Sequence, residues 1–182
     1  MSDLRRLFVR QLREACDMEH LLINALAELA FYADSRVLKF AFKHHRSQTE
    51  QHAERIQKVF REIGESPDRR PCKGIEGIID DAQVGVLEFL GNSALDATLI
   101  AAAQKAEHYE IATYGTLCCW AKVLGETKSV SLLKKNLSDE KTTDKLLSFA
   151  AELLRNPKAK RSESPKRSTE TAEFLKLATH AE

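Results

Sequence analysis

The sequence has little of what interrupts helices or marks a secreted or membrane-bound protein. Its 182 residues include only 7 glycines and 4 prolines, so long uninterrupted runs remain that suit helices. Its 4 cysteines form no Cys-x-x-Cys pair, and no apolar run approaches the roughly 20 residues that span a bilayer. The N-terminal residues do not combine a basic start, an apolar segment and a cleavage site, as a secretory signal peptide does. We therefore expect one all-α, soluble, cytoplasmic domain with reduced cysteines and no membrane contact.

The charge balance is close to neutral, with a formal net charge of +1. Basic residues are in excess only toward the C-terminus, in residues 155–182, while residues 1–154 are nearly balanced. Neither part has the concentrated basic charge of a dedicated nucleic-acid surface, so we do not expect nucleic acid as a partner.

Apolar residues recur every three or four positions along four segments, which predicts four amphipathic helices. They cover residues 3–32, 35–63, 94–124 and 127–155. Residues 64–92 form an excursion between the second and third, with a short helix near 75–89 that Gly77 and Gly85 interrupt. Such a connection is long enough to cross a four-helix bundle. We assign the bundle to residues 1–154, a flexible basic linker to 155–168 and a short helix or tail to 169–182.

Each of the four segments carries ionisable residues inside its apolar stripe. These residues are Glu19 in the first, His45 and His52 in the second, Glu107 and Glu110 in the third, and Glu140 and Asp144 in the fourth. Each polar break lies roughly 10 to 17 residues from the start of its helix, which places all of them near mid-bundle at about 1.5 Å rise per residue. Aspartate and glutamate are almost never buried without partners. A shared pair of cations is the simplest partner for all of them.

Carboxylates and imidazoles suit iron, manganese or zinc, and carboxylates can bridge two ions about 3.5 to 4 Å apart. The usual di-iron bundle supplies a Glu-x-x-His motif from each of two helices. No such motif stands at the expected places here; Gln48 lies one turn from each histidine instead. The pattern therefore leaves open an atypical dinuclear site, a mononuclear site and an inactive one.

Three stretches of the chain resemble the YciE/YciF family of ferritin-like stress proteins. They are the run from Leu99 to Leu117 with its Glu-His-Tyr-Glu motif, the segment Cys72-x-Gly-Ile-Glu-Gly-Ile-Ile, and Ser138-Asp-Glu-Lys-x-x-Asp. The resemblance covers residues 4 to about 154. It implies a ferritin-like, rubrerythrin-like bundle with an extra short helix, a homodimer, a bacterial source and a role in stress responses.

By position, the resemblance maps the family's acidic residues onto this chain. They fall on Glu19, Glu76, Glu107, Glu110, Glu140 and Asp144. The second helix departs from the family, with Gln48 where glutamate is common and His52 where glutamine is common. Since histidine is a good ligand and glutamine a weak one, this helix can still bind metal through a different residue. For Glu76 we favour a supporting or surface role over a ligand role.

The metal set we predict consists of eight residues. These are Glu19, His45, Gln48, His52, Glu107, Glu110, Glu140 and Asp144. The first hypothesis is a stress-response metalloprotein with a dinuclear iron or manganese site, an oxidoreductase acting on oxygen or peroxide. The alternative is a catalytically inactive helical dimer that serves as a scaffold or binding protein, with its buried acids protonated or paired with histidine.

Overall fold

The computed structural model describes residues 2–154, which form five helices and no strand within that range. The helices are α1 (Asp3–Tyr32), α2 (Arg36–Ile63), α3 (Lys73–Phe89), α4 (Leu95–Val123) and α5 (Thr127–Leu154). The predicted bundle helices and the additional short helix are confirmed within one or two residues at their ends. The predicted linker 155–168 and terminal helix 169–182 lie outside the described residues.

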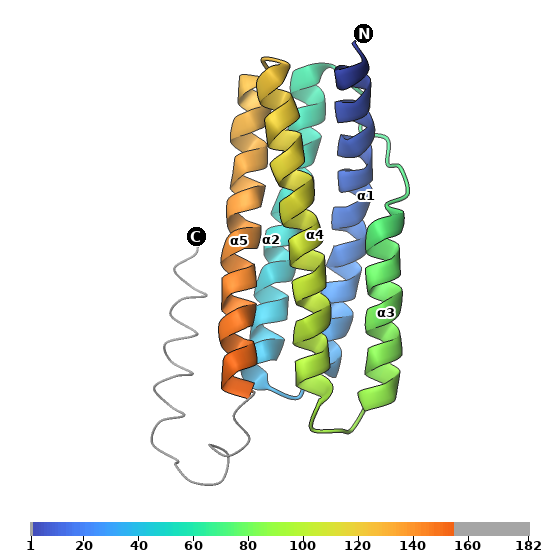
Figure 1. The fold of residues 1–182 in the computed structure, drawn as a ribbon, viewed down its shortest axis with the longest axis vertical. Helices are drawn as coiled ribbons and strands as arrows, with labels where there is room; N and C mark the ends of the chain where they lie inside the picture. Colours follow the sequence, from blue (N-terminus) through green and yellow to red (C-terminus); the bar gives the residue numbers. More distant parts are fainter. Residues whose placement is uncertain (1, 155–182) are drawn as a thin grey trace.

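Four helices, α1, α2, α4 and α5, form the bundle, and α3 packs on its outside against α4 and α1 (Figure 1). Each bundle helix runs antiparallel to the two other bundle helices on which it packs, and α2 and α4 run in the same direction (Figure 1). The segment between α2 and α4 therefore returns along the whole bundle, and α3 is the helical part of this crossover. One long crossover is the connectivity of ferritin-like bundles.

Local hydrogen bonds fix the start of α1 and of α2. Ser2 and Ser35 cap α1 and α2 through their hydroxyls, which accept from backbone N–H groups in the first turn. Gly64 ends α2 with φ 68°, a left-handed conformation that glycine adopts at little cost. Asp96, in the first turn of α4, accepts from the backbone N–H groups of Asp34 (2.8 Å) and Ser35 (2.9 Å) and joins α4 to the α1–α2 turn.

The prediction that Gly77 and Gly85 interrupt the short helix is wrong, because α3 is continuous from Lys73 to Phe89. Glycine lowers helix stability by roughly 0.5–1 kcal/mol, which does not break a helix that packs on a neighbour. Gly85 has a packing role: a Cβ atom there would lie 2.7 Å from the Cγ2 of Thr98 on α4. Gly77 has open space around it.

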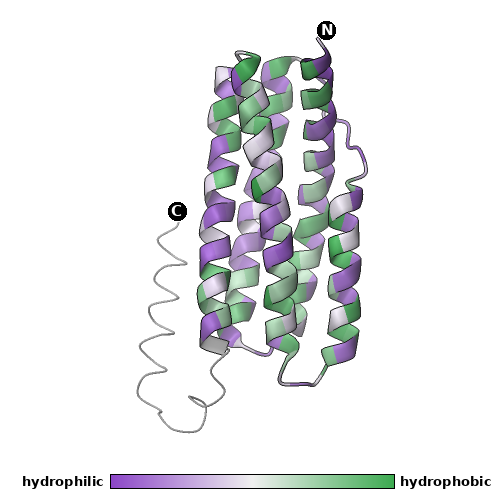
Figure 2. Ribbon diagram, viewed as in Figure 1, coloured by the Kyte–Doolittle hydropathy of each residue, from purple (hydrophilic) through white to green (hydrophobic). Residues whose placement is uncertain are grey.

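Two clusters of buried apolar side chains fill the bundle, one toward each end. Every helix carries both hydrophobic (green) and hydrophilic (purple) residues, as amphipathic helices do (Figure 2). Between the two clusters lies a layer of buried polar side chains. Its members include Glu19, His45, His52, Glu107, Glu110, Asn136, Glu140 and Thr143. The apolar clusters thus enclose a polar layer at mid-bundle.

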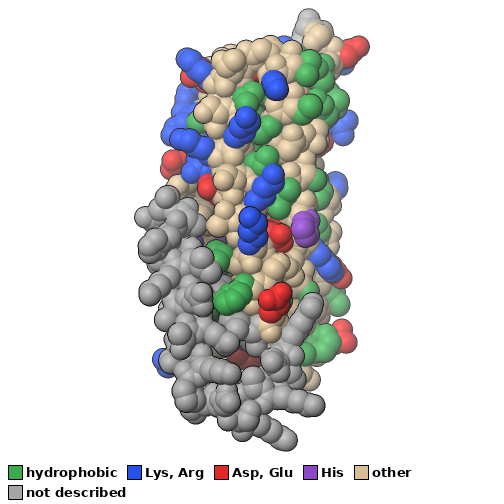
Figure 3. Space-filling model, turned by 60° about the vertical axis from the view of Figure 1, so that its left-hand side comes forward, with side chains coloured by type: hydrophobic (Ala, Val, Ile, Leu, Met, Phe, Trp, Pro, Cys, Tyr) green, Lys and Arg blue, Asp and Glu red, His purple; other side chains and the backbone are tan. Residues whose placement is uncertain are grey.

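The surface is mixed in charge on the face seen in Figure 3, where lysine and arginine (blue) lie among acidic (red) and hydrophobic (green) side chains. This agrees with the near-neutral balance of residues 1–154. Within the described range, none of the helices combines the length and apolar character needed to cross a bilayer.

The two glycines of α3 provide a matched pair of substitutions. We expect Gly77→Ala to raise the free energy of unfolding by about 0.5–1 kcal/mol, since alanine favours the helix and meets no neighbour. Gly85→Ala should give less stabilisation or a net loss, because its methyl group would press on Thr98. Urea unfolding of both variants measures the difference. Equal stabilisation by both would contradict the close approach of α3 to α4.

Candidate metal centre

Six ionisable side chains meet at mid-bundle, and all four bundle helices contribute. They are Glu19 from α1, His45 and His52 from α2, Glu107 and Glu110 from α4, and Glu140 from α5. All six are buried; His45, at 4%, is the most exposed. Helical geometry explains their convergence, because residues three or seven apart share one face of a helix. His45 and His52 are two turns apart on α2, with ring centroids separated by 6.5 Å.

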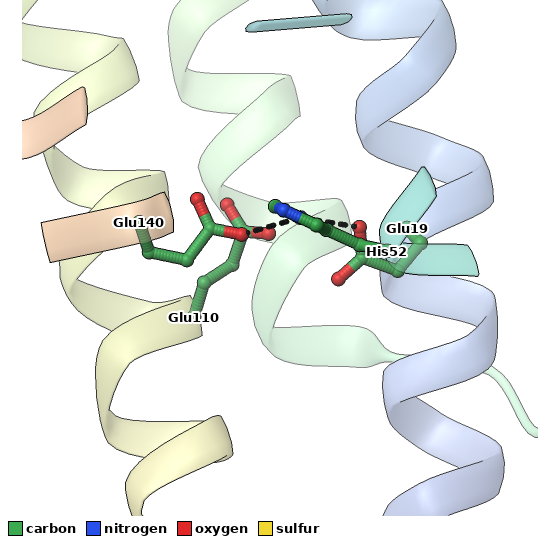
Figure 4. A group of neighbouring side chains, drawn as sticks. All are labelled: Glu19, His52, Glu110 and Glu140. Carbon is green, nitrogen blue, oxygen red and sulfur yellow. Dashed lines mark ion pairs between the residues drawn. The ribbon is translucent and has the colours of Figure 1, made fainter. Parts of the chain in front are cut away.

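The six side chains form two groups of potential ligands, in each of which the ligand atoms lie within 4.8 Å of one another. One group contains Glu19 and His52, and the other contains His45 and Glu107. Glu110 and Glu140 belong to both. Figure 4 shows the first group, with His52 between Glu19 and Glu140. Each group thus offers one histidine, one carboxylate of its own and two shared carboxylates.

The ring of His52 is oriented by Asp139, which lies next to Glu140 in sequence. The Nε2 of His52 is 3.1 Å from Asp139 Oδ2, and the same oxygen accepts from the Arg55 guanidinium at 2.6 Å. An ionised carboxylate can only accept, so Nε2 carries a proton. The opposite nitrogen, Nδ1, faces Glu140 Oε1 at 2.7 Å and Glu19 Oε2 at 3.6 Å. In the neutral ring this nitrogen has a free lone pair, as a metal ligand requires.

His45 is oriented in the same manner by Thr143. The single hydroxyl proton of Thr143 is donated to the Asp139 backbone carbonyl at 3.2 Å, so its oxygen accepts from Nδ1 of His45 at 3.3 Å. The Nε2 of His45 therefore has the lone pair in the neutral ring. It lies 2.9 Å from Glu107 Oε1 and 3.7 Å from Glu140 Oε2. In their neutral forms, both histidines thus direct an unprotonated nitrogen at the carboxylates.

Burial raises the pKa of all four central carboxyl groups. For Glu107 the pKa rises to about 8, and for Glu19, Glu110 and Glu140 it also lies above the usual range. Glu110 has like-charged Glu140 and Glu19 beside it, and their repulsion adds to the effect. Without cations, the carboxyl groups therefore keep protons that they would lose in water.

The two histidines differ in pKa. Burial lowers the pKa of His45 and outweighs its attraction to Glu140. Burial also acts to lower the pKa of His52, but the charge of Glu140 and the hydrogen bond to Asp139 raise it well above the ordinary value. His52 can therefore balance one negative charge by itself, whereas His45 stays neutral.

Many polar atoms of the centre have no hydrogen-bond partner. They are Oε2 of Glu19, Oε2 of Glu107, both carboxyl oxygens of Glu110, and Oε2 of Glu140. A buried polar atom without a partner costs about 1–3 kcal/mol. Cations placed among these atoms would coordinate them, and oxygen with imidazole nitrogen is a donor set that iron, manganese and zinc accept. The residues present therefore fit a pair of such ions.

Asp144 lies outside both groups, and Gln48 is a neutral amide and not one of the ionisable ligands that make up these groups. Gln48 is half-buried beside His45 and forms a side-chain hydrogen bond that raises the pKa of that ring. Asp144, one turn beyond Glu140, has an oxygen 3.6 Å from Nε2 of the exposed His108. Glu76 forms an ion pair with Lys73 at the start of α3, near the surface. The ligand roles of Gln48 and Asp144 remain predictions, as does the supporting or surface role of Glu76.

Other side chains support the centre, and the sequence pattern did not single out most of them. The hydroxyl of buried Tyr114 donates to Glu19. Asn136 donates to the backbone carbonyl of His52 (3.3 Å) and accepts from Arg55 (3.0 Å). Asn136 and Thr143 face the same way as Glu140 because they lie four residues before it and three after it, which is the signal that could have identified them.

Comparison with known proteins places this arrangement in a family. Residues 3–160 match the family model described as "Domain of unknown function (DUF892)". Protein YciF of Escherichia coli (strain K12) is 40% identical over 145 residues, which are 79% of this chain and 87% of that protein.

Two solved structures are also similar. The crystal structure of the E. coli stress protein YciF superposes with a TM-score of 0.82 at 38% identity, covering 86% of this chain and 99% of that one. The structure of YcfI from Rhodopseudomonas palustris gives 0.79 at 34% identity, covering 81% and 94%.

The raised carboxyl pKa values predict a pH-dependent stability for the chelator-treated protein. Glutamates in the unfolded chain have the ordinary pKa of about 4.3. The pKa of Glu107 in the folded protein is about 8, so this carboxyl group keeps its proton up to about pH 8. The unfolded chain therefore binds fewer protons in this window, and the free energy of unfolding should fall as pH rises. His45 has the opposite effect below about pH 6.5, so the fall is clearest between about pH 6.5 and 8.

Urea unfolding at several pH values tests this, and we expect a decrease of more than about 1 kcal/mol across the window. Glu107→Gln is the control, because it removes one of the retained protons and should reduce the slope. A stability that rises with pH in the chelated wild type would show that the carboxyl groups are ionised without metal.

Proposed function

The chain belongs to the YciF-like family described as domain DUF892, and we propose that it holds two iron or manganese ions between its four bundle helices. The observation that supports this most directly is the sharing of Glu110 and Glu140 by two adjacent ligand groups. In dinuclear carboxylate sites the shared carboxylates bridge the two ions. One ion would be held by Glu19 and His52, and the other by His45 and Glu107.

The proposed chemistry is redox chemistry with oxygen or peroxide. An iron or manganese pair supplies electron exchange, for which the carboxylates and imidazoles of the centre are not suited. The protein's own side chains do the rest: Asp139 and Thr143 orient the two imidazoles, and Tyr114 holds Glu19 through its hydroxyl. The apolar clusters on both sides keep the charges away from water, which strengthens their mutual attraction.

The biological setting that we propose is a bacterial stress response, with the chain acting as a homodimer in the cytoplasm. The support is the similarity to YciF, which is described as an E. coli stress protein. An oxidant such as oxygen or peroxide is a small substrate that fits a stress role.

A second candidate function is a catalytically inactive helical protein that acts as a scaffold. Its support is the description of YcfI, a similar structure, as a protein with a proposed structural role. In this alternative the raised pKa values of the central glutamates keep them protonated, and His52 balances the remaining charge. The two functions differ in metal content, which decides between them.

The shared and unshared ligands predict different metal losses. Mass spectrometry of the untagged wild type, purified without chelators, should find about two ions of iron or manganese per chain. Glu140→Gln should remove most of both ions, since it alters both groups. Glu107→Gln and Glu19→Gln should each leave about one ion, because each alters a single group.

Glu76→Gln is the matched control, since this glutamate lies near the surface in an ion pair with Lys73 and outside both groups. It should keep the wild-type metal content. A folded wild type that stays metal-free after reloading would favour the scaffold function, and an unchanged content in Glu140→Gln would exclude this site.

Asp139 offers a test of the supporting residues. Asp139→Asn replaces an ionised acceptor by an amide, which weakens the orientation of the His52 ring and lowers the basicity of its Nδ1. We expect metal affinity to fall about 10- to 100-fold, measured by competition with a chelator of known affinity. Asp81→Asn, at an exposed ion pair with Lys105, is the control and should leave the affinity unchanged.

A further inference from the structure

A cavity of about 560 Å³ lies between α1, α3 and α4 and reaches the candidate metal centre. Exposed side chains line one end of this space, so it is a pocket that opens to the surface and not an enclosed packing void. Pockets for small-molecule ligands span about 300–1,000 Å³. The cavity is thus of the size expected for a small organic molecule.

The walls of the cavity are apolar along most of their length. On α4 the wall consists of small side chains, Ala102, Ala103 and Ala106, and larger apolar residues such as Leu26 and Ile79 line the sides. The three alanines are buried and border the cavity, which lies where α3 makes few contacts with α1.

Polar lining residues are confined to the two ends. At the inner end are His45, Glu107 and Glu110, three residues of the candidate centre. At the outer end Gln83 of α3 donates to Glu28 of α1 at 3.4 Å. A ligand in this cavity would therefore meet hydrocarbon along its length and polar groups at its inner end.

The cavity extends from exposed side chains at its mouth to buried side chains at its inner end. Phe31 and Leu87 at the mouth are 76% and 77% exposed, while Glu110 at the inner end is fully buried. A helix is about 10 Å wide and could cover only the mouth. An extended alkyl chain is much thinner than a helix, so it is the better candidate for a molecule that reaches from the mouth to the buried inner end.

We propose that this cavity binds an unbranched aliphatic molecule with one oxygen-bearing end, its tail between α1 and α3 and its polar head at His45, Glu107 and Glu110. The position of the head beside metal ions rests on the proposed function. The binding of the tail by the apolar walls does not depend on the proposed function, because these walls exist whether or not ions are bound. The substrate of the centre then belongs to the class of aliphatic alcohols, aldehydes or acids.

Calorimetric titration of the full chain with dodecanol tests the proposal, because this neutral probe needs no metal ion. We expect saturable one-site binding with a negative heat-capacity change, both in metal-free and in metal-loaded protein. Ala102→Leu places a larger side chain in the cavity and should weaken binding about tenfold, as expected when about two buried methylene groups are displaced. Ala101→Leu is the matched control, since the neighbouring Ala101 is exposed and does not line the cavity.

A second measurement does not depend on any variant. A dodecanol analogue carrying a diazirine near its hydroxyl, activated in the wild type, should label peptides that contain residues of the inner end, such as Ala106 or Leu22. Labels confined to the exposed residues at the mouth would overturn the proposal, because they indicate adsorption on an apolar surface. Equal affinity of Ala102→Leu and wild type for dodecanol would also overturn the proposal. Absence of binding would overturn it too, whether a second copy of the chain or the chain's own C-terminal residues fill the space.

The metal proposal and the cavity proposal can fail separately. Dodecanol binding by a protein that takes up no metal would overturn the dinuclear centre and keep the aliphatic site. Stoichiometric metal without dodecanol binding would keep the dinuclear centre and overturn the aliphatic site.

Discussion

The desolvation of four neighbouring carboxyl groups is the constraint on which the rest of this structure depends. Glu19, Glu107, Glu110 and Glu140 lie together at mid-bundle and are at most 1% exposed. Keeping an ion buried costs several kcal/mol even after relaxation, so such groups need protons or cations. Of the two nearby histidines, only His52 has a raised pKa, so the imidazoles cannot balance four negative charges. The bundle therefore keeps either several protons or bound cations at its centre.

The surroundings assign different roles to chemically identical groups. Asp139 is partly buried, yet its hydrogen bonds with His52 and Arg55 outweigh the effect of burial and lower its pKa. It therefore stays ionised and orients a ring, while the central glutamates keep protons until something replaces them. Apolar clusters on both sides make each of these differences larger, since charges interact more strongly away from water.

The crossover segment between α2 and α4 follows from the topology of the bundle and also lines the cavity that leads to the candidate metal centre. Because α2 and α4 run in the same direction, the chain between them must return along the bundle, and α3 forms during that return (Figure 1). Glycine at position 85 lets α3 lie close to α4, whereas the alanines of α4 leave space next to α1. The same segment that closes the topology thus forms one wall of the cavity.

The sequence by itself determined the helices, their ends and the level of the polar layer. These follow from local rules: capping residues and glycines set the ends, and the rise of 1.5 Å per residue places Glu19, His52, Glu107 and Glu140 at one depth. Only the tertiary structure decided which carboxylates are shared, since this depends on how each helix is rotated about its own axis. Asp144 lies on the stripe of α5 but outside both ligand groups for this reason. The continuity of α3 and the cavity beside it also depend on contacts between residues far apart in the chain, which no local pattern records.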